Sequence, residues 1–191
     1  MKNKDLILYI HGWNSHRDAR KALLLKDKIN PSKNFQVESI TLQSHPKEAI
    51  LQLSKFIEKE RGERKVHLVG SSLGGYYATF LSEKYNLKSV MINPAVWAYK
   101  IFKNDMGENK NLNTNESYII DEEWVASLKE IFVEKPSSEN YLVLLQTGDE
   151  TLNYKFSAEY YDGSKIIIDE GGNHSFENLE IKIPQMLLHF S

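Results

Sequence analysis

The chain has 191 residues, enough for one domain with a sizeable hydrophobic core, whereas two domains would be cramped. Its 24 basic and 26 acidic residues give a formal charge of −2 and are dispersed along the chain, which argues against a nucleic-acid-binding protein. The absence of cysteine excludes disulfides, thiolate metal ligands and thiol nucleophiles.

The start of the chain does not resemble a targeting segment. Met1 to Lys4 is basic, but the apolar run from Leu6 to Ile10 is shorter than the core of a secretory signal and lacks a small-residue cleavage site. No apolar run approaches the length of a membrane span. We therefore expect a soluble, cytoplasmic protein.

The first hundred residues alternate between predicted strands and predicted helices. The strands are apolar or alternating runs at residues 6–10, 35–42, 66–69 and 89–93. The helices between them have apolar residues at helical spacing, at 18–29, 46–61 and 72–85. This order predicts an α/β fold, a compact, mostly parallel sheet wound by right-handed crossovers with helices on both faces. Ligands of such sheets bind beyond the carboxyl ends of the strands.

The alternation breaks between Ala95 and Glu139. A short helix is expected near Val96–Ile101, an exposed loop at Asn104–Asn115 and a clearer helix near Glu122–Ile131. This excursion (residues 95–139) lies where hydrolases often carry a lid. It is predicted to be either such a lid or a solvated insertion with no role in binding.

The alternation then returns to the end of the chain. Strands are predicted at residues 141–145 and 165–168, with a helical stretch at 152–160 between them. Residues 176–190 have apolar side chains at helical spacing, but Pro184 should end or kink a helix there. The whole chain, residues 1–191, is thus predicted to be one domain with residues 95–139 as an insertion.

The most informative motif follows the strand at residues 66–69. Gly70-Ser71-Ser72-Leu73-Gly74 has the form G-x-S-x-G, and it lies between a predicted strand and a predicted helix. In an α/β-hydrolase such a turn presents the serine as a nucleophile, and small residues two positions before and after it make room for the strained backbone. The alternative is a Gly/Ser-rich turn after a buried strand.

A serine nucleophile needs a base, and His174 is the strongest of six histidines for that role. It follows the last predicted strand in a Gly-Gly-Asn loop, downstream of Ser72. The other histidines are assigned to packing, loops or the terminal helix: His11, His16, His45, His67 and His189.

The base needs an acid to orient it, and Asp149, after the penultimate strand, is favoured. The order Ser72, Asp149, His174 is that of α/β-hydrolases. Asp169 competes because it also ends a strand, and Glu150 is a weaker alternative.

Ester cleavage also needs donors for the developing oxyanion. The backbone N–H of Leu73 is expected to be one, and that of Trp13, in the loop after the first strand, the other. Tyr76, Tyr77 and Trp97 are candidates to line an apolar acyl site, although aromatic side chains near a sheet edge more often serve packing.

Five segments in this order resemble the YqiA/YcfP-like family of small bacterial α/β-hydrolases. They are LYIHGWNS at 8–15, VGSSLGGYYAT at 69–79, NPAV at 93–96, QTGDE at 146–150 and EGGNHSF at 170–176. The resemblance spans nearly the whole chain. It departs at Trp13, where phenylalanine is expected in many members, and at residues 97–135, which match poorly and would shape the acyl pocket.

The resemblance implies hydrolysis of carboxylic esters, or of acyl thioesters such as acyl-CoA, with Ser72, Asp149 and His174 as the triad. The expected partner is a small-molecule ester or thioester, and no metal or organic cofactor is expected. Two rival functions are acyl transfer by the same triad and non-catalytic ligand binding. The intact order of the triad argues against the second rival.

Overall fold

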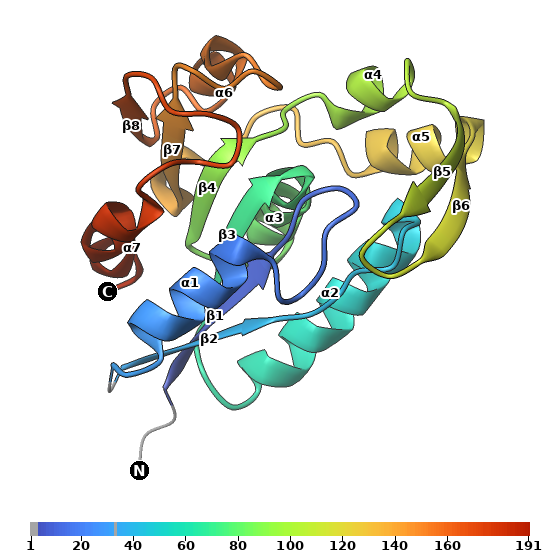
Figure 1. The fold of residues 1–191 in the computed structure, drawn as a ribbon. Coiled ribbons are helices and arrows are strands. Elements are labelled where there is room, and N and C mark those ends of the chain that lie inside the picture. The colour runs from blue at the N-terminus through green and yellow to red at the C-terminus, as the bar shows by residue number, and fades with distance from the viewer. Residues whose placement is uncertain (1–3, 33) are drawn as a thin grey trace.

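The structure is a computed structural model that describes residues 4–32 and 34–191. The first three residues of the basic start of the chain lie outside the described residues. A six-stranded sheet, in which every neighbouring pair is parallel, forms the centre of the molecule (Figure 1). Its strands, in spatial order, are β2 (Phe35–Ser39), β1 (Asp5–Ile10), β3 (Val66–Ser72), β4 (Ser89–Pro94), β7 (Tyr141–Gln146) and β8 (Lys165–Asp169).

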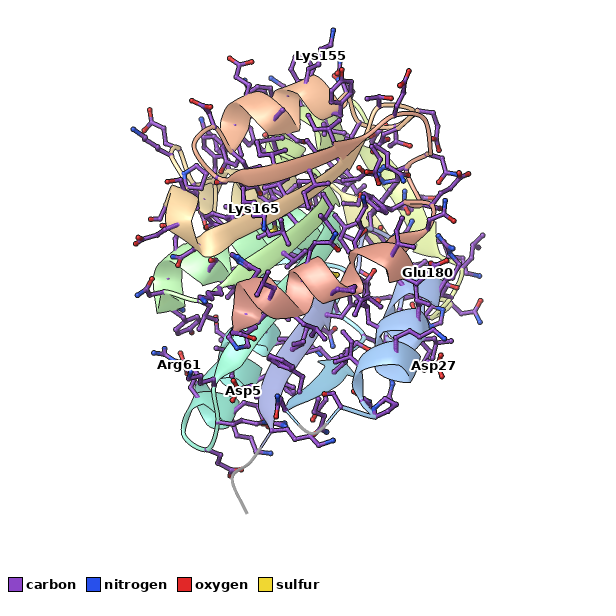
Figure 2. The ribbon with its side chains drawn as sticks, turned by 90° about the vertical axis from the view of Figure 1, so that its left-hand side faces the viewer. Asp5, Asp27, Arg61, Lys155, Lys165 and Glu180 are labelled. Carbon is purple, nitrogen blue, oxygen red and sulfur yellow. The ribbon has the colours of Figure 1, made fainter. Side chains whose placement is uncertain are left out.

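Alternate side chains of the strands form two hydrophobic clusters on opposite faces of the sheet. One cluster packs against α1 (Arg20–Ile29) and α7 (Ile183–Phe190), which lie next to each other on that face (Figure 2). The other packs against α2 (Pro46–Arg61), α3 (Leu73–Tyr85) and α6 (Tyr154–Tyr160). The central strands are therefore apolar on both faces, as predicted for a parallel sheet covered by helices. This is the α/β-hydrolase fold expected from the sequence.

The excursion is folded and packed onto the rest of the chain. It contains α4 (Ala98–Phe102), strands β5 (Gly107–Asn111) and β6 (Glu116–Ile120), and α5 (Glu122–Glu130). The segment predicted as an exposed loop at 104–115 is largely exposed, but it is not a loop throughout, because β5 lies within it and pairs with β6 as an antiparallel hairpin around a turn at 112–115. Trp124 and Leu128 of α5 are fully buried against the α2–α3 face, so the excursion adds to the core.

The C-terminal segment also differs from the prediction at its proline. A 3-10 turn covers Leu179–Lys182, and Pro184 lies in the first turn of α7 instead of ending a helix. A proline fits that position because the first turn of a helix has no intrahelical acceptor for its N–H groups. In the described part of the chain, no helix has the length and apolar character needed to cross a bilayer.

Candidate active site

Ser72 is the last residue of β3 and immediately precedes α3. Its backbone has φ 56° and ψ −124°, a conformation that costs energy for any residue with a side chain. The turn is tight enough that a Cβ on Gly74 would overlap the carbonyl oxygens of Ile10 and His11. The sequence therefore needs glycine two positions after the serine, as the motif predicts.

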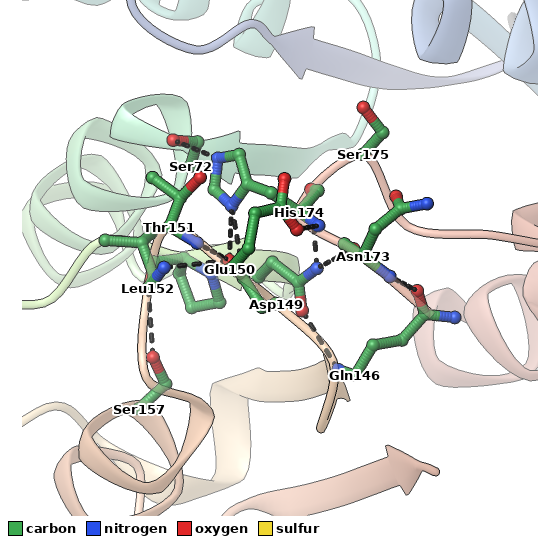
Figure 3. A network of polar contacts seen from close by, with 12 residues as sticks. Ser72, Gln146, Asp149, Glu150, Thr151, Leu152, Ser157, Asn173, His174 and Ser175 are labelled. Atoms are coloured by element: carbon green, nitrogen blue, oxygen red, sulfur yellow. Dashed lines mark hydrogen bonds and ion pairs between the residues drawn. The ribbon is translucent and has the colours of Figure 1, made fainter. Parts of the chain in front are cut away.

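The hydroxyl of Ser72 begins a chain of hydrogen bonds that runs through two other loops (Figure 3). Its Oγ lies 3.1 Å from Nε2 of His174. On the other side of the ring, His174 Nδ1 lies 2.8 Å from Oδ2 and 3.0 Å from Oδ1 of Asp149. The imidazole thus bridges a hydroxyl and a carboxylate, which favours the tautomer with the proton on Nδ1 and a free lone pair on Nε2.

The Asp149 carboxylate is held by the turn that follows β7. Its Oδ1 accepts hydrogen bonds from the backbone N–H of Thr151, at 2.9 Å, and of Leu152, at 2.8 Å. The side chain is only 2% exposed. Burial opposes ionisation, but the hydrogen bonds from His174 and the two backbone donors outweigh it and lower the pKa of Asp149. A charged carboxylate therefore faces the imidazole.

The two other carboxylates weighed for the acid role have different partners. Asp169 ends β8 as predicted, but its Oδ1 accepts from Lys182 Nζ at 2.6 Å, and it makes no contact with His174. Glu150 accepts the backbone N–H of His174 at 2.9 Å, which lowers the pKa of its exposed carboxyl. Asp149 is thus the carboxylate that the fold brings to the imidazole, while Glu150 fixes the backbone that carries it.

Two polar residues that the sequence analysis did not single out hold the His174 loop. Asn93, which ends β4 with φ 40°, donates from Nδ2 to the carbonyl of Asn173 at 3.0 Å and accepts from the N–H of Gln146. Gln146 Oε1 in turn accepts from the backbone N–H of Asn173 and Glu177. Asn93 lies within the segment NPAV and Gln146 within QTGDE. The feature of the sequence that could have identified both residues is an amide side chain near the end of an apolar strand.

The loop after β1 lies directly against the serine. A Cβ on Gly12 would be 3.1 Å from Ser72 Cβ and 3.6 Å from its Oγ, so only backbone fits there. His11 shapes this loop as predicted: its Nε2 accepts from the N–H of Leu42 at 3.1 Å, and Nδ1 donates to the carbonyl of Gly12 at 2.9 Å. Burial lowers the pKa of His11 and keeps it neutral.

The two residues expected to supply oxyanion donors flank the serine in space. Leu73 is the first residue of α3, so its N–H has no acceptor within the helix. Trp13 follows Gly12. Its indole is directed away from the serine, donating from Nε1 to the Tyr118 hydroxyl at 2.6 Å and packing edge-on against Phe102. Leu73 directly follows Ser72, and Trp13 lines the same cleft as Ser72, while their role as oxyanion donors stays a prediction.

A cleft of about 420 Å³ opens over Ser72 and His174. Its walls come from the loop after β1, the start of α1, the elbow and the loops after β7 and β8. The residues that line it include Gly12, Ala19, Arg20, Lys21, Ser72 and Ser175.

The aromatic residues predicted to line an acyl site lie elsewhere. Tyr76 is buried in the core and donates from its hydroxyl to the Leu128 carbonyl at 2.8 Å. Tyr77 is also buried, and Trp97 packs against Phe156 with Lys100 over its ring. None of the three lines the cleft at Ser72. The expectation for Tyr76 and Trp97 is thus corrected, because packing between helices takes up both rings.

Of the other histidines, His67 lies in the core as predicted, stacked on Phe190 at 4.7 Å. Burial, partly offset by Asp5, lowers the pKa of His67 to about 4. Within residues 4–32 and 34–191, no cluster of three or more His, Asp or Glu side chains is arranged to hold a metal ion.

Comparison of the chain with known proteins identifies a family and its members. A model of the family described as "Uncharacterised protein family (UPF0227)" matches residues 6–191. The UPF0227 protein YcfP of Salmonella gallinarum is 26% identical over 180 residues, which cover 91% of this chain and 92% of that protein. YcfP of Escherichia coli K12 is 25% identical over 177 residues, with the same coverage of both chains. The family resemblance predicted from the motifs is confirmed.

Solved structures share the fold at much lower identity. Est1E from Butyrivibrio proteoclasticus, solved with ferulic acid bound, superposes with a TM-score of 0.81 at 15% identity, over 100% of this chain and 90% of Est1E. Mouse alpha/beta hydrolase domain-containing protein 10 gives a TM-score of 0.73 at 15% identity, over 97% of this chain and 90% of the mouse chain. At this identity the likeness establishes the α/β-hydrolase fold.

Proposed function

The chain belongs to the uncharacterised protein family UPF0227, and we propose that it is a serine hydrolase that cleaves carboxylic esters through an acyl-enzyme. The observation that carries the proposal is the hydrogen-bonded series from Ser72 Oγ through His174 to the buried Asp149 carboxylate. The strained conformation of Ser72 supports it, because strain at a residue with a side chain is tolerated mainly where function requires it. The names of the solved neighbours, which include hydrolases, agree with this chemistry.

The reaction follows from the positions of the three groups. His174 Nε2 takes the proton of Ser72 as Oγ bonds to the acyl carbon, and Asp149 stabilises the imidazolium that forms. The N–H groups of Leu73 and Trp13 would donate to the developing oxyanion. The intermediate then collapses: the C–O bond to the leaving alcohol breaks, and the alcohol takes the proton from Nε2.

Deacylation repeats these steps with water. His174 removes a proton from water, the hydroxide attacks the acyl carbon, and Ser72 leaves with the proton returned from Nε2. The same steps serve a thioester, with a thiol as the leaving group, so acyl thioesters are included in the proposed substrate range. These steps need neither a metal nor an organic cofactor.

The test compares wild-type protein with Ser72→Ala on p-nitrophenyl esters and acyl thioesters of graded chain length, together with labelling by a fluorophosphonate. Loss of the nucleophile should lower kcat by about 10³-fold or more and abolish labelling. Ser138→Ala is the matched control. This exposed serine lies just before the N-terminal end of β7, whereas Asp149 follows the C-terminal end of that strand.

Three outcomes would count against the proposal in different ways. Equal rates for wild type and Ser72→Ala, with no labelling of the wild type, would reject a serine hydrolase. Labelling and acyl-enzyme formation without release to water, but with release to an added alcohol or amine, would indicate an acyltransferase. Saturable binding of an ester without labelling or turnover would indicate a ligand-binding protein.

A further inference from the structure

Two basic side chains line the cleft that holds Ser72. Arg20 and Lys21, the first two residues of α1, line the same cleft of about 420 Å³ as Ser72 and His174. Both residues lie in the helix predicted at 18–29, to which the sequence assigned no role in binding. A substrate whose carbonyl carbon contacts Ser72 would therefore lie in the same cleft as these two cations.

Within the described ranges 4–32 and 34–191, no carboxylate lies within 4.0 Å of either cation. Arg20 Nη2 donates to the carbonyls of Ser175, at 3.0 Å, and Phe176, at 3.3 Å. Lys21 Nζ donates to the Ser175 carbonyl at 3.1 Å. A guanidinium has five N–H donors and an ammonium three, so most donors of both groups remain available to a ligand.

The helix start makes this charge pair unfavourable unless an anion is present. Arg20 and Lys21 occupy the positive end of the α1 dipole, where acidic side chains are normally preferred. The first turn of α1 holds no acidic residue. The side chain of the N-cap residue Ala19 has no atom that could accept a hydrogen bond from the free N–H groups of that turn. Two positive charges, an uncapped helix end and a cavity thus coincide.

The pKa of Lys21 reflects its place in the cleft. Burial, and then repulsion by Arg20, lower the pKa of Lys21 to about 8, while Asp149 acts in the opposite direction. A bound carboxylate or phosphate would stabilise the protonated ammonium and form a charge-assisted hydrogen bond with it.

We propose that this cleft selects esters that carry an anionic group, a carboxylate or a phosphate, near the scissile bond, and that Arg20 and Lys21 bind this group. The inference rests on the hydrolase function proposed above and narrows its substrate class. The competing explanation is structural: through Ser175 and Phe176 the two cations would only hold the loop that carries His174.

Matched ester pairs distinguish these explanations. Each pair has one anionic and one neutral member: monophenyl adipate with phenyl hexanoate, 4-acetoxybenzoate with its methyl ester, and 4-acetoxyphenyl phosphate with 4-acetoxyanisole. The first pair places a carboxylate on the acyl side, the second a carboxylate on the alcohol side, and the third a phosphate there. The proteins are wild type, Lys21→Met, Arg20→Gln and the control Lys28→Met, from the far end of α1.

We expect wild type to favour the anionic member of at least one pair by about 10-fold or more in kcat/KM. Lys21→Met and Arg20→Gln should each remove most of that preference through KM while leaving the neutral ester within about 2-fold. Lys28→Met should keep the preference. The pair that responds identifies the anion and the side of the ester that carries it.

A binding measurement keeps this inference separate from the hydrolase proposal. Ser72→Ala protein, with and without Lys21→Met, is titrated with adipate and with inorganic phosphate by calorimetry. Saturable binding that Lys21→Met weakens supports the anion site even if no ester is turned over. No preference in any pair, an equal loss for both members of a pair, or no anion binding would overturn the inference.

Discussion

Asp169 ends β8 and Asp149 lies three residues beyond the end of the neighbouring strand β7, yet the environments of the two carboxylates differ. Gln146 pairs with Asp169 in the β7–β8 register, so the two carboxylates begin from adjacent positions. The turn after β7 directs Asp149 to the imidazole, whereas Lys182 takes up Asp169. The three residues of turn backbone after Gln146 therefore bring Asp149 to the imidazole, whereas Asp169 at the strand end forms a largely buried ion pair.

The two carboxylates predict opposite results for the same substitution. Asp149→Asn should lower kcat by about 10²- to 10⁴-fold, because an amide cannot hold His174 in the tautomer that leaves Nε2 free. The measurement is steady-state hydrolysis of a p-nitrophenyl ester.

Asp169→Asn is the control for that experiment. It removes the partner of Lys182, whose side chain is only 10% exposed, so it should lower stability by about 3 kcal/mol, while kcat of the folded protein stays within about 3-fold because Asp169 has no contact with His174. A large loss in Asp169→Asn together with an active Asp149→Asn would show that the acid has been assigned to the wrong strand.

Lys21 predicts a pH dependence of substrate preference. Its ammonium, with a pKa near 8, is charged below that pH and loses its proton as the pH rises through it. The other charged groups that act on Lys21 are the Arg20 guanidinium and the Asp149 carboxylate, whose lowered pKa keeps it ionised over this range. The ratio of kcat/KM for an anionic ester over its neutral partner should therefore decline from pH 7 to pH 9.5. A flat ratio in wild type would rule out a contribution from Lys21.

Residue-level prediction selected residues that the fold brings together where their positions follow from local backbone chemistry, and their catalytic roles stay predictions. Ser72 and His174 could be chosen because each follows a strand within a glycine-rich turn. Asn93 and Gln146 could not, because their importance lies in hydrogen bonds to a loop some 30 to 80 positions away in the chain. Arg20 and Lys21 resembled an ordinary solvated helix start, and only the fold places them in the cleft that holds the serine.

At the scale of whole elements, the β5–β6 hairpin is bound to the loop that follows β1. The Tyr118 hydroxyl accepts from Trp13 Nε1 and donates to Asn14 Oδ1 at 2.7 Å. Asn109 and Asn113 add hydrogen bonds to the side chain and carbonyl of Asn14. The hairpin therefore fixes the loop whose Trp13 N–H is proposed as an oxyanion donor.

Removing the Tyr118 hydroxyl should loosen that donor. Tyr118→Phe keeps the ring but deletes two hydrogen bonds, each worth about 1 kcal/mol, so kcat should fall by about 3- to 10-fold with little change in KM. Ser117→Ala, which alters the neighbouring exposed residue on the other face of β6, is the control. A rise in KM with kcat unchanged would instead mean that Tyr118 contacts the substrate.

The same hairpin explains the main error in the predicted elements. β5 reads Gly-Glu-Asn-Lys-Asn and has no apolar side chain, so it lacks the alternation by which a strand is recognised. Asparagine side chains bound to a distant loop stabilise it, and such long-range hydrogen bonds leave no periodic signal. Five strands of the large sheet have buried side chains and the edge strand β8 carries three consecutive isoleucines, and all six strands were predicted within a few residues.

For the molecule as a whole, buried neutral histidines predict sensitivity to acid. His11, His67 and His189 have pKa values lowered mainly by burial, and that of His67 falls to about 4. At these histidines the unfolded chain takes up protons near pH 6.5, whereas the folded chain does not, so their contribution to the free energy of unfolding is constant above that pH and decreases as the pH falls toward 4.

Urea unfolding at pH 7 and pH 4.5 tests this linkage. The wild type should lose stability over that interval, and His67→Leu should lose about 1 to 3 kcal/mol less, because one pKa unit corresponds to about 1.4 kcal/mol. His16→Ala, in the loop before α1, is the control. An equal loss in wild type and His67→Leu would mean that His67 takes up its proton in the folded state.

The excursion connects two strands that are neighbours in the sheet, β4 and β7. Its length can therefore change without altering strand order or register, and the entropic cost of a longer connection is small, about 0.6 kcal/mol for each doubling of its length. The excursion is thus a segment in which insertion, deletion or exchange between relatives can proceed while the elbow and its two supporting loops stay constant. Chimaeras that swap residues 95–139 should accordingly keep the order of the sheet, but they should keep kcat only where the donor supplies hydrogen bonds equivalent to those from Tyr118 and Asn113 to the loop after β1.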